Sequence, residues 1–133
     1  MNSNNLIIEI SNLFKSYNNE NNIKIDIIKN LNFKLKVNSK VSIIGPSGSG
    51  KTTLLNIIGL LDREYDGNYN FKSKNTSLLS QKEINNLRGL SIGFIHQFFH
   101  LIPELTVIEN VMLPLLINKN DINSYEIKKI YWK

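Results

Sequence analysis

The octet Gly45–Thr52, GPSGSGKT, constrains the fold most, because it has the P-loop spacing GxxxxGK followed by Ser or Thr. An apolar run, VSII, precedes the octet, and a second apolar run, LLNIIGLL, follows it. A P-loop holds phosphate where a strand enters the glycine-rich loop and a helix leaves it, and these two flanks indicate that order. The octet therefore predicts a site for a nucleoside triphosphate with magnesium.

Individual loop positions have expected roles. Gly48 and Gly50 can take backbone conformations that other residues avoid, which lets consecutive N–H groups turn toward phosphate oxygens. Lys51 is expected to reach the β and γ phosphates, the Thr52 hydroxyl to bind Mg²⁺, and Thr53 to contact the α-phosphate. The predicted nucleotide-binding loop consists of Gly45, Pro46, Ser47, Gly48, Ser49, Gly50, Lys51, Thr52 and Thr53.

Composition limits the class of protein. The chain has 133 residues, 41% of them hydrophobic and 20% charged, which is typical of one globular domain. It has no cysteine and only two histidines, so disulfides and thiolate metal sites are excluded. No apolar run approaches the roughly 18 residues of a membrane span, and the N-terminus does not resemble a secretory signal, so we expect a cytoplasmic protein. The lysines behind the net charge of +5 are spread along the chain, which does not favour a nucleic-acid partner.

The first forty residues are predicted to be β-rich. Loose alternation over residues 6–13, a polar stretch KSYNNENN and renewed alternation in IKIDII indicate a hairpin. The segment 30–37, NLNFKLKV, alternates strictly and predicts a half-exposed antiparallel strand. Residues 41–45 are nearly continuously apolar, which is typical of a strand covered on both faces in a parallel α/β core.

Helical signals follow. Apolar spacing predicts a largely buried helix over residues 51–61, and a turn at Asp66-Gly67 should lead into a short strand. Ser80 with Glu83, and Thr106 with Glu109, have capping-box spacing and predict the starts of two helices, the first ending near Arg88 at Gly89. We expect a strand over residues 91–97 and a short helix over residues 124–133.

Two long segments carry a family resemblance: LNFKLKVNSKVSIIGPSGSGKTTLLNIIGLLD and IGFIHQFFHLIPELTVIENVMLPLL. They resemble the ATP-binding subunit of an ABC transporter, in the branch that serves macrolide-export and lipoprotein-release permeases of the MacB and LolD type. The resemblance covers nearly all of residues 6–116. It implies an ABC ATPase of the P-loop NTPase class, an α/β fold with an N-terminal antiparallel β subdomain, incomplete at the C-terminus.

The resemblance implies further roles. Tyr17 falls where the family carries an aromatic residue that stacks on adenine, and Gln97 falls at the Q-loop glutamine, which contacts Mg²⁺ and the attacking water. Catalytic roles are thus expected for Lys51 and Gln97, with ATP and Mg²⁺ as cofactors. The implied organisation is a β-rich part over 1–40, a P-loop core over 41–97, and the start of the helical subdomain over 98–133, which docks on a membrane permease. In the family this places the protein at the inner face of the cell membrane.

Other family motifs are not found in the sequence. It contains no LSGGQ-like signature, no Walker B Asp-Glu pair and no switch histidine. In the family these groups support Mg²⁺, activate water and complete the site of the second subunit of a homodimer, so neither hydrolysis nor dimerisation is predicted for this chain by itself. The sequence fits a piece of a longer cassette or a gene cut short by a frameshift or early stop. The strand at 41–45 would then have an unpaired apolar edge that promotes aggregation.

Three alternatives stay open at this point. A P-loop kinase shares GPSGSGKTTL, although such kinases begin almost at their P-loop. A GTPase would explain NKND at 118–121, which fits the guanine-reading NKxD pattern, but no DxxG lies between the P-loop and that tetrapeptide, and a chain rich in Asn and Lys produces such a match by chance. A non-catalytic remnant that binds nucleotide, or nothing, has the same motifs and differs in turnover alone.

Overall fold

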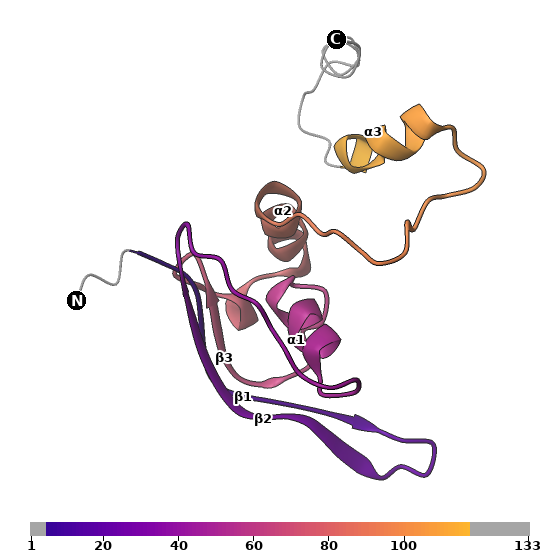
Figure 1. The fold of residues 1–133 in the computed structure, drawn as a ribbon. Coiled ribbons are helices and arrows are strands. Elements are labelled where there is room, and N and C mark those ends of the chain that lie inside the picture. The colour runs from indigo at the N-terminus through magenta and orange to yellow at the C-terminus, as the bar shows by residue number, and fades with distance from the viewer. Residues whose placement is uncertain (1–4, 118–133) are drawn as a thin grey trace. The chain divides into compact units, whose positions relative to one another are not determined.

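The computed structural model describes residues 5–117, which form two compact units. Among these residues, the first unit ends at Ile84 and the second begins at Asn85. Figure 1 shows the elements of each unit. The helix expected over 124–133 and the NKND tetrapeptide lie outside the described residues.

An antiparallel sheet forms the core of the first unit. Its strands are β1 (Leu6–Asn18), β2 (Lys24–Lys36), β3 (Asp66–Phe71) and β4 (Lys74–Asn75), in the order β2-β1-β3-β4. β1 and β2 form the expected hairpin, visible as the long paired ribbons of Figure 1. Side chains along the second half of β2 alternate between partly buried and exposed, as predicted for a half-exposed strand. The buried hydrophobic core consists of Ile8, Ile10, Leu13, Ile28, Ile57, Leu60, Tyr69, Phe71 and Ile84.

A β-bulge interrupts β1 at Asn12. The pairing with β2 shifts between Ile10 and Leu13, and Asn12 has a φ of 51°, a left-handed conformation that asparagine tolerates well. The extra residue changes which positions face inward, since Ile10 and Leu13 are both buried although they are three residues apart. Gly67 lies opposite the bulge, with a φ of 102°, and a Cβ there would lie 2.2 Å from the carbonyl oxygen of Asn12. The short strand expected here is present as β3. The expectation of a turn at Asp66-Gly67 is wrong, because both residues belong to that strand.

Helices begin where the sequence indicated. α1 (Lys51–Ile58) starts at the end of the glycine-rich loop, although it ends three residues earlier than expected, at the Gly59 cap. α2 (Gln81–Ser91) starts with the predicted capping box: the Ser80 amide donates to Oε2 of Glu83 over 2.8 Å. α3 (Val107–Ile117) starts with the second box, in which the Thr106 amide donates to Glu109 over 2.8 Å. Between β4 and α2 lies a 3₁₀ turn, η2 (Thr76–Leu78).

Several further sequence expectations are wrong. The strands expected over residues 41–45 and 91–97 are not formed: Ser91 ends α2, and residues 41–45 and 92–97 pair with no strand in the described part of the chain. An extended segment becomes a sheet strand only by pairing. α2 continues past Gly89 to Ser91, because a single glycine in a helix costs only about 1 kcal/mol and does not force an end. α1 is less buried than expected, with Leu55 half-exposed.

None of the helices within residues 5–117 is both long enough and apolar enough to cross a membrane.

Candidate functional site

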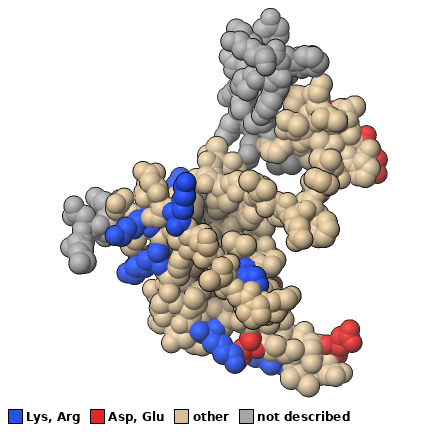
Figure 2. Space-filling view, viewed as in Figure 1, with Lys and Arg blue, Asp and Glu red and all other residues tan. Residues whose placement is uncertain are grey.

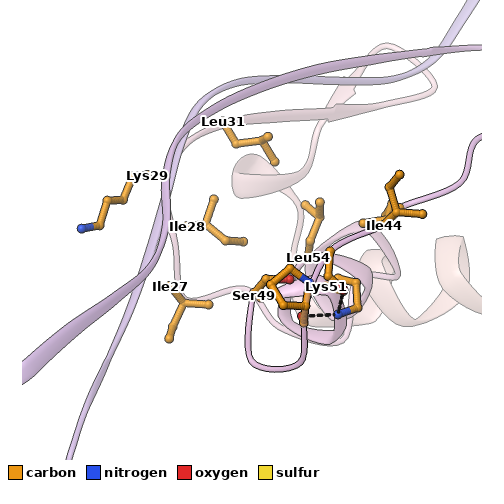
Figure 3. Close-up of a pocket in the computed structure, with 12 residues that line it drawn as sticks. Ile27, Ile28, Lys29, Leu31, Ile44, Ser49, Lys51 and Leu54 are labelled. Carbon is orange, nitrogen blue, oxygen red and sulfur yellow. Dashed lines mark hydrogen bonds between the residues drawn. The ribbon is translucent and has the colours of Figure 1, made fainter.

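The glycine-rich loop folds around the side chain of Lys51. The Lys51 Nζ donates hydrogen bonds to the carbonyl oxygens of Gly45, over 2.9 Å, and Pro46, over 2.6 Å. The dashed lines of Figure 3 mark these two bonds. The lysine therefore lies inside the turn of the loop, at the first position of α1.

Backbone geometry at the loop follows the sequence expectation. Gly48 and Gly50 have φ angles of 77° and 85°, in the left-handed region that glycine favours. A Cβ on Gly50 would also lie 2.9 Å from Cγ2 of Ile27, so the close approach of β2 leaves space only for glycine. Around Gly48 the position of a Cβ is open. The loop thus has room on its outer side at Gly48 and none on the side that faces β2.

The start of α1 presents amide groups without protein partners. The first hydrogen bond into the helix comes from Leu54 N–H to the Gly50 carbonyl, over 2.9 Å. Within residues 5–117, the amides of Lys51, Thr52 and Thr53 have no hydrogen-bond acceptor, as is usual for the first turn of a helix. No side chain caps this end. Unpartnered N–H groups at the positive end of a helix favour a phosphate oxygen.

A cavity of about 380 Å³ lies between the loop and β2. Figure 3 shows Ile27, Ile28 and Leu31 of β2 on one side and the loop with Lys51 on the other. Its charged lining residues are Lys29 and Lys51, and none of its lining residues is a carboxylate. The β2 side of the cavity is therefore mostly apolar, with Lys29 as its charged residue, and Lys51 supplies positive charge at the loop.

The donor set of this loop fits a triphosphate and a hard cation. The Thr52 side chain is exposed at the helix start, and a neutral hydroxyl oxygen is a suitable Mg²⁺ ligand when phosphate oxygens supply the rest of the coordination. No cluster of three or more His, Cys, Asp or Glu side chains that would hold a metal without such help occurs in the described part of the chain.

Tyr17 lies near the end of β1, outside the residues that line the cavity. Its side chain is 44% exposed, and its hydroxyl donates to Oδ2 of Asp62 over 3.1 Å. Tyr17 pairs with Ile25 on β2, two residues before the Ile27 side chain that limits the space at Gly50. Tyr17 is therefore connected to the P-loop through β2, by way of Ile25 and Ile27.

Lys15 and Asp62 were not predicted from the sequence as part of this region. Lys15 is 4% exposed, and its Nζ lies 2.9 Å from Oδ2 of Asp62. Burial opposes ionisation of Asp62, but hydrogen bonds from Lys15, the Glu64 amide and Tyr17 outweigh it and lower the pKa of the carboxyl below its usual value. One signal in the sequence was available. Lys15 lies two residues after the apolar Leu13 and so on the same, inward face of the strand, where a lysine needs an acidic partner.

Gln97 belongs to the second unit, where it lies exposed in a segment without regular structure. Around it, the rings of Phe94 and His96 stack with centroids 5.4 Å apart, and those of His96 and His100 with centroids 4.7 Å apart. The apolar side chains Phe98 and Phe99 are 72% and 91% exposed. Gln97 therefore lies next to an exposed apolar segment of the second unit.

Charged side chains show no single basic patch on the face drawn in Figure 2. Lysines and arginines occupy several separate places on the first unit. This distribution agrees with the spread of lysines along the sequence.

Comparison with known proteins identifies the family. A model of the family described as ABC transporter matches residues 28–131. The lipoprotein-releasing system ATP-binding protein LolD of Hydrogenovibrio crunogenus is 43% identical over 114 residues, which is 86% of this chain and 49% of that protein. The macrolide export ATP-binding/permease protein MacB of Pasteurella multocida is 39% identical over 110 residues, or 83% of this chain and 17% of that protein.

Solved structures give the same result. The dimeric structure of MJ0796, described as a bacterial ABC transporter cassette, matches with a TM-score of 0.82 and 41% identity over 92% of this chain and 53% of that chain. A post-hydrolysis state of the same cassette bound to ADP and Pi matches at 40% identity, also with a TM-score of 0.82. The chain spans about half the length of the LolD protein and of these cassettes. It belongs to the ABC transporter family and has the fold of part of an ATP-binding cassette.

Proposed function

We propose that this chain binds Mg-ATP at its P-loop and works as part of the ATP-binding subunit of an ABC transporter of the lipoprotein-release or macrolide-export type. The observation that carries the proposal is the loop wrapped around Lys51, with the Nζ held by the Gly45 and Pro46 carbonyls beside three unpartnered amides of α1. A loop of this shape offers an anion one cation and several N–H donors at once.

Each loop residue takes a role in this proposal. Lys51 exchanges its carbonyl acceptors for oxygens of the β and γ phosphates, and the backbone from Gly45 to Gly50 cradles the phosphates. The Thr53 amide and side chain serve the α-phosphate. The Thr52 hydroxyl would ligate the Mg²⁺, which when bound would supply positive charge to the phosphates, and Gln97 would be the further ligand that the family resemblance implies. Tyr17 stacks on the adenine base.

The segment after Gln97 is proposed to contact a membrane permease. Phe98, Phe99 and Leu101 are all more than 60% exposed, and a contiguous exposed apolar segment is typical of a protein interaction site. The relatives include a protein that combines ATP-binding and permease parts and a subunit of a lipoprotein-releasing system, which supports a permease as the partner. The proposed location is the cytoplasmic face of the membrane, through that permease, and a homodimer is proposed only for the full-length family cassette.

The test is a titration of the 133-residue chain with Mg-ATP in a calorimeter. Wild type should bind, and Lys51→Ala should weaken binding at least about tenfold, because a charge-assisted contact to phosphate is lost. Lys82→Ala is the matched control. Lys82 is exposed on α2, so this substitution removes the same charge at a position outside the loop. Equal affinities of wild type and Lys51→Ala would disprove the P-loop site.

Turnover in the same samples separates the remaining alternatives. Binding without phosphate release is expected of the chain by itself, because none of the residues with a proposed role in the site is a carboxylate that could act as a base for the attacking water. Hydrolysis that depends on Lys51 and appears only with an added permease complex would show that another chain completes the site.

A further inference from the structure

Lys15 is a buried cation whose partners come from the segment after α1. Its Nζ lies 2.9 Å from Oδ2 and 3.0 Å from Oδ1 of Asp62, and it also donates to the carbonyl oxygen of Glu64. A lysine that is 4% exposed would be strongly destabilising without such partners. The pair joins positions 47 residues apart and so fixes β1 to the segment that follows α1.

The same two residues hold the ring of Tyr17. Asp62 accepts the hydrogen bond of the Tyr17 hydroxyl through Oδ2, the oxygen that also contacts Lys15. The Lys15 Nζ lies 4.7 Å from the centroid of the Tyr17 ring, in cation–π contact with one face. A ring anchored at its hydroxyl and covered on one face keeps the other face available, in agreement with a side chain that is 44% exposed.

These contacts connect Tyr17 to both ends of α1. Through β2, Tyr17 lies near the start of α1, because its partner Ile25 is two residues from Ile27 at Gly50. Through Asp62, it is bonded to the segment that follows α1. The distance between Tyr17 and the P-loop is therefore set by the strand pairing near the start of α1 and by the hydrogen bond to Asp62 after its end.

We propose that Lys15 and Asp62 are positioning residues that fix the Tyr17 ring for a purine base before the nucleotide binds. This inference rests on the proposed function, since it needs Tyr17 to stack on the base of a nucleotide whose phosphates lie in the P-loop. Neither Lys15 nor Asp62 is expected to contact the nucleotide. Their effect is to remove the ring freedom that would otherwise be lost on binding, which raises affinity without a new contact.

A positioning role predicts a ligand-dependent effect. Mg-ATP contains a base, and Mg-tripolyphosphate contains the same phosphate chain without one. Loss of the anchor should weaken binding of Mg-ATP and leave binding of Mg-tripolyphosphate unchanged, whereas general damage to the fold should weaken both.

The experiment titrates both ligands into wild type, Tyr17→Phe and Lys15→Met by calorimetry. Tyr17→Phe keeps the ring and removes only the hydroxyl that Asp62 holds, and Lys15→Met keeps a long side chain and removes the cation. We expect each variant to weaken Mg-ATP binding about fivefold and to leave Mg-tripolyphosphate binding within error of wild type. Lys34→Met is the matched control, because it breaks a different ion pair, one between β1 and β2, in which the Lys34 Nζ lies 2.7 Å from Oε1 of Glu9.

A double-mutant cycle makes the role specific. In a Tyr17→Ala background, where no ring remains to be held, Lys15→Met should cause no further loss of Mg-ATP affinity. A loss of the same size in both backgrounds would overturn the inference, and so would wild-type Mg-ATP affinity in Tyr17→Phe and Lys15→Met.

Failure of the proposed function has a different signature. If Lys51→Ala and Tyr17→Ala both leave Mg-ATP binding unchanged, there is no P-loop site and the positioning inference falls with it. If Lys51→Ala weakens both ligands and Lys15→Met weakens neither, the P-loop site stands and only the positioning inference is overturned. Should Lys15→Met not fold, Tyr17→Phe alone decides, since it leaves the Lys15–Asp62 pair intact.

Discussion

Gly67 lies so close to Asn12 that a Cβ on the glycine would be 2.2 Å from the Asn12 carbonyl oxygen. No side chain can occupy that space without movement of the backbone, and the φ of 102° at Gly67 adds strain for any other residue. The bulge of β1 and the start of β3 therefore require each other.

Gly67→Ala should lower the free energy of unfolding by about 2 kcal/mol or more, since it combines backbone strain with a steric clash. Urea denaturation of the purified chain measures this loss. Gly93→Ala is the control, because a Cβ at Gly93 meets nothing within 4 Å, and it should change stability by less than about 0.5 kcal/mol. Equal stabilities of the two variants would contradict the close approach at Asn12.

The Asp62 carboxyl predicts a pH dependence of stability. Its pKa is lowered in the folded chain, so its contribution is present above the pKa of the unfolded state, near 4, and is lost as the pH falls through the lowered value. Wild type should be more stable than Asp62→Asn at pH 7, and the difference should shrink as the pH falls toward about 2. Thermal unfolding of both proteins over this pH range measures it, and a constant difference would exclude the ionised pair as its source.

The capping boxes should make measurable contributions to their helices. Ser80→Ala removes the hydroxyl that contacts Glu83 over 2.7 Å, and a lost cap of this kind costs about 1 kcal/mol. Hydrogen exchange at the first amides of α2 should become faster in this variant. Ser39→Ala, at an exposed serine outside any helix, should leave that exchange unchanged.

Exposed apolar residues before the P-loop should promote self-association. Ile44 is 90% exposed and Val41 is 55% exposed, in a segment that has no strand partner within residues 5–117. Val41→Thr combined with Ile44→Thr should reduce light scattering of concentrated solutions, because the apolar area available for contact between chains decreases. Ile57→Thr, at a fully buried position of α1, should instead lower stability and increase scattering.

Local signals in the sequence predicted local structure well. The hairpin of β1 and β2, both capping boxes and the start of α1 depend on residues close together in the chain, and all were confirmed. The positive φ angles of Gly48 and Gly50 followed from the P-loop motif for the same reason.

Features that depend on distant residues were missed. The apolar segments 41–45 and 92–97 have strand-like sequences, yet a strand exists only with a partner, and a sequence pattern does not show whether one is present. The Lys15–Asp62 pair depends on contacts across 47 residues, and the bulge at Asn12 has no marker beyond an asparagine in a strand. The roles of Tyr17 and Gln97, which the family resemblance implied, stay predictions.

The bulge at Asn12 has a consequence for how related sequences should vary. Ile10 and Leu13 both face inward because Asn12 takes up one extra residue between them. In a homologue that lacks this residue, regular alternation would run on from Ile10. The side chains equivalent to Leu13, Lys15 and Tyr17 would then stay on the faces of β1 that they occupy here. Without the bulge the carbonyl no longer crowds β3, and position 67 is free to carry a side chain. The extra residue and the glycine should therefore be gained and lost together in evolution.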